Sequence, residues 1–204
     1  MAKRVELIFD FVSPNAYLIW GPLRDIVART GAELDITPVF LGGMHKLTGN
    51  APPMIRDAEV KGKNEYAALE MNRFIAKHGL TKFKLHPKFP FNSIALMRMV
   101  VVAVQDGCAV EFIDAMLPAI WEDGADITDP ATLGGLVSSA GFDAADYAAR
   151  IQTDAVKQTL IGNTNHAVER GSFGIPTMYV GPQGGPQEMF FGKERLGQIE
   201  EMLG

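Results

Sequence analysis

The strand-like segments of this chain stand at its two ends, and a long block of helical pattern separates them. Near the N-terminus, apolar residues on both faces of residues 5–11 indicate a strand buried inside a sheet. A helix from Pro14 to Thr30 and a second strand over about residues 32–41 should follow, forming a β-α-β unit. The chain ends with the pattern of a hairpin and a closing helix, over residues 177–180, 188–191 and 193–203. This order predicts one α/β layer assembled from both ends of the chain.

Between the two ends the sequence predicts helices and one irregular segment. Residues 42–53, which read GGMHKLTGNAPP, are rich in glycine and proline, and we expect a surface loop there. Helical patterns follow over residues 66–79, 93–106, 110–122, 130–139 and 144–167. A length of 204 residues suits one domain with an insertion. We therefore expect an α/β thioredoxin-like fold built from about residues 1–45 and 160–204, with an all-helical insertion over about residues 46–159.

The composition excludes several classes of protein. Cys108 is the single cysteine, which excludes an intrachain disulfide and a multi-cysteine metal site. The net charge of −5, with acidic and basic residues interspersed, offers no basic surface for nucleic acid. The four histidines show no ligand spacing, so we predict no metal. The longest apolar run is far shorter than the ~20 residues of a membrane span, and the N-terminus lacks a cleavable leader pattern, so we expect a cytoplasmic protein without a membrane partner.

Ser13 lies where the first strand meets the first helix, a place where ligands of α/β sheets commonly bind. The pair Ser13-Pro14 is typical of a helix start, because serine caps free N–H groups and proline fits the first turn. A cap alone would explain the serine. The same free N–H groups and the helix dipole also favour an anion such as a thiolate or a carboxylate. The residues themselves leave both interpretations open.

Six segments of the sequence resemble, in the same order, the motifs of the 2-hydroxychromene-2-carboxylate isomerase family. They are FDFVSPNAYL, KLTGNAPP, KNEY at residues 63–66, FPFNSIALMR, GSFGIPTMYV and FFGKERL. The resemblance covers about residues 5–203. This family lies beside the kappa-class glutathione transferases and shares their DsbA-like thioredoxin fold, so the resemblance implies that fold here, with a large helical insertion.

The resemblance implies a site that takes its sulfur from a cofactor. In the family, the serine of the SPxxY motif stands where a dithiol oxidoreductase has the first cysteine of CxxC, and here the four positions read Ser13-Pro14-Asn15-Ala16. Because neither cysteine is present, disulfide oxidoreductase chemistry is excluded, and the resemblance implies glutathione as the source of the thiol. Ser13 is then the catalytic residue, since a hydroxyl donor and the helix N-terminus both favour the thiolate.

The resemblance also implies which residues hold the cofactor near the last strands. Ile175 and Pro176 correspond to the cis-proline pair of thioredoxin-like proteins, which pairs with the ligand's backbone as an added strand would. Glu194 and Arg195 correspond to the turn that binds the γ-glutamyl end of glutathione, although the family more often has aspartate at the first position. Without the resemblance, Pro176 would be a strand-start proline and Glu194 an ordinary partner of the helix dipole.

Four further residues match family positions in the middle of the chain. Asn50 and Lys63 correspond to residues that face glutathione and the substrate carboxylate, and lysine suits an anion as a point charge. Asn15 and Asn92 correspond to positions beside the substrate. Asn15 stands where the family more often has an aromatic residue, which implies that the side of the site next to the sulfur is more polar here. By composition alone, Lys63 would be a solvated side chain and Asn92 a helix cap.

The resemblance implies a glutathione-dependent cis–trans isomerase that converts 2-hydroxychromene-2-carboxylate to trans-o-hydroxybenzylidenepyruvate in aromatic hydrocarbon catabolism. Its partners would be a small aromatic carboxylate substrate and a second copy of the chain in a homodimer. One alternative is a kappa-like glutathione transferase, in which sulfur stays on the electrophile, and sequence spacing does not separate the two. An alternative of another class is a non-catalytic thioredoxin-fold protein that binds a partner at the same groove.

Overall fold

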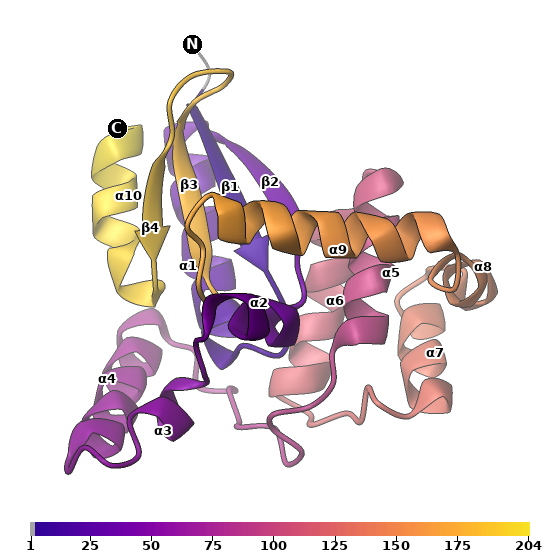
Figure 1. Cartoon of the computed structure of the whole chain (residues 1–204), viewed down its shortest axis with the longest axis horizontal. Helices are drawn as coiled ribbons and strands as arrows, with labels where there is room; N and C mark the ends of the chain where they lie inside the picture. Colours follow the sequence, from indigo (N-terminus) through magenta and orange to yellow (C-terminus); the bar gives the residue numbers. More distant parts are fainter. Residues whose placement is uncertain (1–2) are drawn as a thin grey trace.

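A computed structural model describes residues 3–204. Its single sheet has four strands in the order β2-β1-β3-β4, and Figure 1 shows that both ends of the chain contribute to it. β1 runs parallel to β2 and antiparallel to β3, while β3 and β4 form an antiparallel hairpin. The bounds are β1 Lys3–Phe9, β2 Glu33–Pro38, β3 Thr177–Pro182 and β4 Glu188–Phe191. The expected α/β layer built from both ends of the chain is confirmed.

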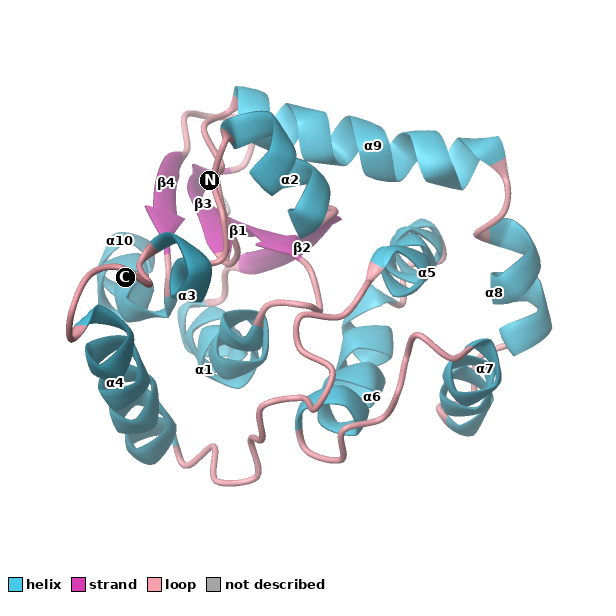
Figure 2. Ribbon diagram, turned by 60° about the horizontal axis from the view of Figure 1, so that its bottom comes forward, coloured by secondary structure: helices cyan, strands magenta, loops and turns pink. Residues whose placement is uncertain are grey.

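Helices cover both faces of the sheet (Figure 2). On one face lie α1 (Pro14–Thr30), the short 3-10 helix η1 (Lys193–Arg195) and α10 (Leu196–Leu203). On the other lie α2 (Leu41–Thr48) and α9 (Asp154–Glu169). β1 is buried from Val5 to its end because it sits between two strands and two helical layers.

The remaining helices fall within the expected insertion, whose limits stay a prediction. Figure 1 shows α5 to α8 as a group beside β2, whereas α4 stands apart near α10. α5 buries seven apolar residues, but α4 buries none. The bounds are α3 Pro53–Arg56, α4 Lys63–His78, α5 Ile94–Gln105, α6 Ala109–Trp121, α7 Pro130–Ser139 and α8 Ala144–Arg150.

Two local predictions were wrong. The segment expected to be a loop at residues 42–53 contains α2, because its glycines give room to Phe40: a Cβ on Gly42 would come within 2.9 Å of that ring. Gly49, in the left-handed conformation, then ends the helix. The single helix expected over residues 144–167 is two helices. Thr153 starts the second by accepting a hydrogen bond from the Val156 N–H at 3.4 Å.

Candidate active site

Ser13 is buried at the junction of β1 and α1, and its side chain does not cap the helix. Only 4% of the residue is exposed, and no side-chain hydrogen bond closes the first turn of α1. Instead, the Ser13 hydroxyl donates to the carbonyl oxygen of Ile175 at 3.2 Å. The hydroxyl therefore bridges the helix start to the segment before β3, and the N-terminus of a 17-residue helix stays available to an anion.

Ile175 and Pro176 form the other wall of this junction. Their peptide bond is cis, which confirms the expectation from the resemblance. Ile175 is 6% exposed, and its backbone N–H donates to no residue within 3–204. The carbonyl of Pro176 accepts a hydrogen bond from the Gly192 N–H at 3.0 Å, which brings the turn before η1 to the same place. A buried N–H without a partner is costly, so this position suits a ligand carbonyl.

Asn50 contacts the same segment from the other side. Its amide nitrogen donates to the carbonyl of Phe173 at 2.7 Å, although the two residues are 123 positions apart in the sequence. Its side-chain oxygen accepts hydrogen bonds from the backbone N–H of Ala51 at 2.9 Å and from Arg56 at 3.4 Å. The structure thus brings Asn50 to the segment that meets Ser13.

Lys63 begins α4 and is part of a charged cluster with Arg56 and Asp57. The Lys63 ammonium lies 2.9 Å from a carboxylate oxygen of Asp57, and the Arg56 Nε lies 2.9 Å from the same oxygen. Hydrogen bonds from Arg56 and then from Lys63 hold the pKa of Asp57 well below its ordinary value. Two cations share one carboxylate, so the cluster keeps a net positive charge.

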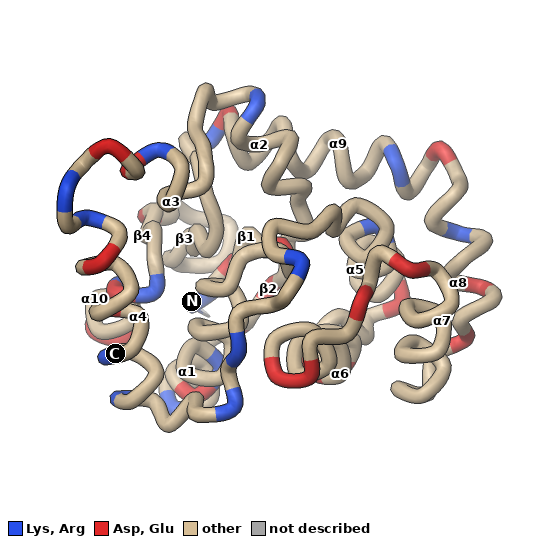
Figure 3. The backbone as a smooth tube through the Cα atoms, turned by 90° about the horizontal axis from the view of Figure 1, so that it is seen from below, with Lys and Arg blue, Asp and Glu red and all other residues tan. Residues whose placement is uncertain are grey.

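In Figure 3 the tube between α3 and α4 alternates between basic and acidic positions. Arg56 was missed by the sequence reasoning, because an arginine after a proline-rich turn carries no local signal of its role. Its proximity also affects His45: burial, followed by the charge of Arg56, lowers the pKa of that imidazole.

Glu194 and Arg195 lie in η1, immediately after the turn that contacts Pro176. Arg195 is exposed and donates to Gln198 at 3.4 Å. The Glu194 carboxylate, which is half-exposed, is paired with the ammonium of Lys193. Lys193 is only 6% exposed, and its ammonium lies 5.6 Å from the centre of the Phe74 ring in α4. The sequence reasoning missed Lys193, because a lysine at a helix start is ordinarily solvated.

The two asparagines expected beside the substrate have different surroundings. The side-chain oxygen of Asn15, in the first turn of α1, is buried and has no hydrogen-bond partner in the described part of the chain. Asn92 is exposed, and its side-chain oxygen accepts from the Ile94 N–H at 3.0 Å at the start of α5. Asn15 thus has a free buried oxygen two residues after Ser13 in the sequence. Asn92 makes the hydrogen bond expected of a cap and, within residues 3–204, none to Ser13.

The loop that carries Ser13 is held in place by a buried carboxyl. Asp10, at the end of β1, is fully buried and accepts from the backbone N–H groups of Val12 at 3.0 Å and Leu41 at 2.8 Å. Burial raises the pKa of Asp10 to about 6, although these two hydrogen bonds oppose the shift. From the helical block, the Trp121 indole N–H donates to the carbonyl of Phe11 at 3.0 Å.

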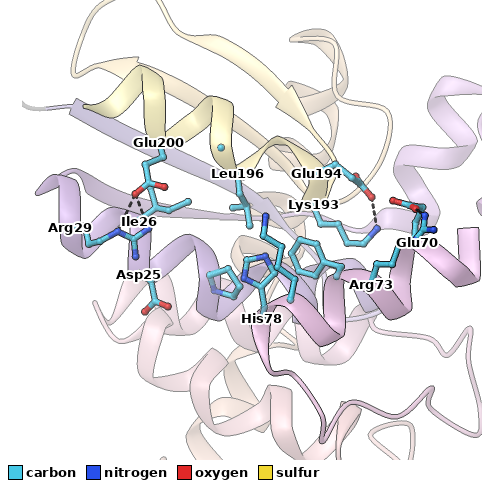
Figure 4. Close-up of a pocket in the computed structure, with 14 residues that line it drawn as sticks. Asp25, Ile26, Arg29, Glu70, Arg73, His78, Lys193, Glu194, Leu196 and Glu200 are labelled. Atoms are coloured by element: carbon cyan, nitrogen blue, oxygen red, sulfur yellow. Dashed lines mark hydrogen bonds and ion pairs between the residues drawn. The ribbon is translucent and has the colours of Figure 1, made fainter.

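A cavity of about 460 Å³ lies between the second half of α1, α4 and the segment from η1 to α10 (Figure 4). Lys193 and Glu194 line it, whereas Ser13 and Ile175 do not. Its lining mixes apolar residues, such as Phe74 and Leu196, with paired charges that include Lys193 and Glu194.

At Ser13 the structure presents a hydroxyl donor at a helix N-terminus beside the unpartnered backbone N–H of Ile175. A cationic cluster at the start of α4 and a carboxylate in η1 lie on the segments that follow Asn50 and Gly192. These groups suit an extended ligand that has an anionic atom near Ser13 and charged groups of both signs at its ends.

Among residues 3–204, no group of three or more histidine, cysteine, aspartate or glutamate side chains is arranged to hold a metal ion. No helix in the same range has the length and the apolar character needed to cross a membrane.

Comparison with known proteins gives a consistent match over the whole chain. A family model described as a DSBA-like thioredoxin domain matches residues 4–204. The chain is 30% identical to 2-hydroxychromene-2-carboxylate isomerase from Sphingobium xenophagum, in an alignment that covers 100% of this chain and 99% of that protein. It is 26% identical to glutathione S-transferase kappa 1 from Homo sapiens, over 100% of this chain and 92% of the human protein.

A solved structure supports the fold. The structure of selenomethionine 2-hydroxychromene-2-carboxylate isomerase superposes with a TM-score of 0.80 at 24% sequence identity, covering 97% of this chain and 93% of the other. At that identity the likeness concerns the fold, which is the DsbA-like thioredoxin fold with added helices.

Proposed function

This chain belongs to the DsbA-like thioredoxin family that includes the 2-hydroxychromene-2-carboxylate isomerases, and on that premise we propose that it is a glutathione-dependent cis–trans isomerase. Its substrate would be 2-hydroxychromene-2-carboxylate or a similar small aromatic carboxylate, and its product the trans-o-hydroxybenzylidenepyruvate. We place this activity in the cytoplasm, in the breakdown of an aromatic hydrocarbon.

The orientation of Ser13 carries the proposal. A serine that served only as a helix cap would accept a hydrogen bond from the first turn of α1, but this hydroxyl donates across to Ile175. The hydroxyl hydrogen can turn about the Cβ–Oγ bond, so the same group can donate to a ligand atom. With the free helix N-terminus beside it, Ser13 can lower the pKa of a thiol and orient its sulfur.

The residues present fit glutathione. The unpartnered N–H of Ile175 would hold its backbone, and Glu194 with Arg195 would hold its γ-glutamyl end. Asn50 and Lys63 would face glutathione and the carboxylate of the substrate. When bound, glutathione supplies the thiol nucleophile whose reversible addition to a conjugated double bond permits rotation about that bond. Ser13 keeps that sulfur deprotonated, and Asn15 and Asn92 would orient the substrate.

The proposal is tested by the amount of glutathione that the reaction needs. With 2-hydroxychromene-2-carboxylate as substrate, we expect product to accumulate well past one equivalent of glutathione, with free thiol equal at the start and the end. Loss of thiol in step with product would favour a kappa-like transferase. Undiminished activity in thiol-free buffer would contradict the role of glutathione, and the absence of any turnover with or without thiol would favour a non-catalytic binding protein.

A further inference from the structure

Lys193 carries a buried positive charge at the turn where the proposed function places one end of the ligand. Its side chain is 7% exposed, and its ammonium is paired with one carboxylate oxygen of Glu194. Figure 4 shows the side chain lying across the cavity wall toward Glu70 and Arg73 of α4, and the Phe74 ring lies 5.6 Å from the ammonium. A lysine this deeply buried is fixed in place rather than exchanging freely with water.

Glu194 is half-exposed, and both of its carboxylate oxygens have close neighbours in the turn. Its second carboxylate oxygen lies over Gly192, so close that a Cβ at Gly192 would be 2.8 Å from it. Partial burial acts to raise the pKa of Glu194, but the hydrogen bond from Lys193 and the carboxylate's own backbone N–H outweigh it and leave the pKa below its ordinary value. At neutral pH the turn therefore presents a charged carboxylate that already has one ammonium.

We propose that Lys193 determines which charge this turn accepts from a ligand, by competing with the ligand's own ammonium for Glu194. This inference rests on the proposed function, which places the γ-glutamyl end of glutathione at the turn. A carboxylate paired with a buried ammonium attracts a second ammonium more weakly, and the Lys193 charge favours a carboxylate in its place. The turn thus tolerates thiols that lack an α-amino group better than the same turn without Lys193 would.

The experiment compares two thiols by calorimetric titration of the full chain. One is glutathione, and the other is glutaryl-cysteinyl-glycine, which lacks only the α-amino group of the γ-glutamyl end. The variant is Lys193→Met, because methionine keeps the apolar stem against Phe74 and removes the charge. In Lys193→Met, we expect the dissociation constant of glutathione to fall relative to that of glutaryl-cysteinyl-glycine by roughly fivefold or more. The reason is that the close pair between Lys193 and Glu194 is lost, which frees the carboxylate for the ligand's ammonium.

The controls separate direct pairing from a general loss of charge. Lys77→Met removes one positive charge from the same cavity, and no hydrogen bond or ion pair joins Lys77 to Glu194 among residues 3–204. Lys77→Met should keep the wild-type ratio of the two dissociation constants. Lys193→Arg should also keep it, because arginine retains the positive charge. If Lys193→Met does not fold, as judged by circular dichroism, Lys193→Gln serves the same comparison with a neutral polar side chain.

The outcomes distinguish this inference from the function on which it rests. An unchanged ratio in the Lys193 variant, with glutathione still bound by the wild type, would overturn the role of Lys193 alone. Equal weakening of both thiols would also overturn it, because Lys193 would then hold the carboxylate that both ligands share. Failure of the wild-type chain to bind glutathione at millimolar concentration would overturn both the inference and the proposed function.

Discussion

At Ser13, the backbone and the side chain of one residue serve different partners. The backbone belongs to the helix start, since the Ser13 N–H donates to Asp10 and its carbonyl accepts from Ala16. The hydroxyl leaves that turn and reaches Ile175. A serine that only capped the helix would keep its hydroxyl in the first turn. The contact with Ile175 therefore argues against the cap alone and favours a ligand-binding role for the Ser13 hydroxyl.

Replacing Ser13 by alanine should lower turnover much more than it lowers affinity for glutathione. The hydroxyl is proposed to stabilise the thiolate, while other residues hold the peptide. One such donor is worth up to about 100- to 1,000-fold in rate. Steady-state kinetics and calorimetry on Ser13→Ala measure the two effects, with Ser138→Ala on exposed α7 as a control that should match the wild type. Wild-type turnover in Ser13→Ala would reduce the residue to a structural role.

Asp10 should give the stability of the protein a distinctive dependence on pH. Its pKa is raised from 3.8 to about 6 in the folded chain, so the folded state binds the proton more tightly than the unfolded state. The stability that this group contributes is therefore complete below about pH 4 and falls as the pH rises through 6, by at most roughly 3 kcal/mol.

Urea unfolding of the wild type and of Asp10→Asn at several pH values between 4 and 7 measures this effect. The variant should be less stable throughout, because an amide cannot accept from both Val12 and Leu41, but it should lose this part of the pH slope. The exposed Asp25→Asn should keep the slope. A slope that survives in Asp10→Asn would assign the effect to another group.

At the scale of elements, glycines decide which segments can approach one another. Gly42 lets α2 pass over Phe40, and Gly174 lets the Phe191 ring of β4 come beside the segment before Ile175, where a Cβ would be 2.9 Å from that ring. In a sequence, glycines at such positions indicate a loop or a turn, which is why residues 42–53 were predicted as a loop. Here the glycines allow close packing instead, and the segment contains a helix.

The same substitution should have opposite effects in two elements. A Cβ on Gly181, in β3, would collide with the backbone carbonyl of Pro186 and lie 3.0 Å from the Cα of Gln187, so Gly181→Ala should destabilise the hairpin by about 1–3 kcal/mol. Gly135 lies inside α7 with nothing within 4 Å of its Cβ position, so Gly135→Ala should stabilise by about 0.5–1 kcal/mol. Thermal and urea unfolding measure the change in the free energy of unfolding for each variant. Changes of the same sign in the two variants would contradict this account.

At the scale of the whole molecule, the stretch from α3 through α4 exposes several large apolar side chains. They are between 44% and 64% exposed, and they are Met54, Ile55, Val60, Tyr66 and Leu69. No residue of α4 is fully buried, although Met71, Phe74 and Ile75 are partly buried against the core. Clustered exposure of this kind is unusual for a monomer. The homodimer implied by the family resemblance would bury it.

The expected mass in sedimentation equilibrium is therefore twice the 22.2 kDa of one chain. Replacing Ile55 and Leu69 together by glutamate should shift the protein to a monomer, because charges at both positions would repel across the interface. Replacing Val104 and Ile161, which are 41% and 50% exposed elsewhere, should leave the mass unchanged. A wild-type monomer at micromolar concentration would contradict the homodimer.

Much of the fold followed from local features of the sequence. The start of α1 at Pro14, its end before Gly31 and the hairpin after Pro176 were all predicted, because caps, turns and periodicity depend on residues close together in the chain. The thioredoxin-like fold was expected from the order of the elements as well as from the family resemblance, whereas the cis bond at Pro176 followed from the resemblance. The residues that correspond to the site, including Asn50 and Lys63, were named by the same route, and their roles stay predictions.

What the tertiary structure decided is how those residues meet. The hydroxyl of Ser13 contacts a carbonyl 162 positions away, and the Asn50 amide contacts one 123 positions away. Neither pairing has a local signal, because each exists only after β3 inserts beside β1 and α2 packs on the sheet. The deep burial of Lys193 and Asp10 has the same origin. Burial and long-range pairing are properties of the packed chain, so the fold determined the surroundings of Ser13, Asn50 and Asp10. The pairs Lys193–Glu194 and Arg56–Asp57 join neighbours in the sequence, and for Lys193 it was the burial that the fold decided.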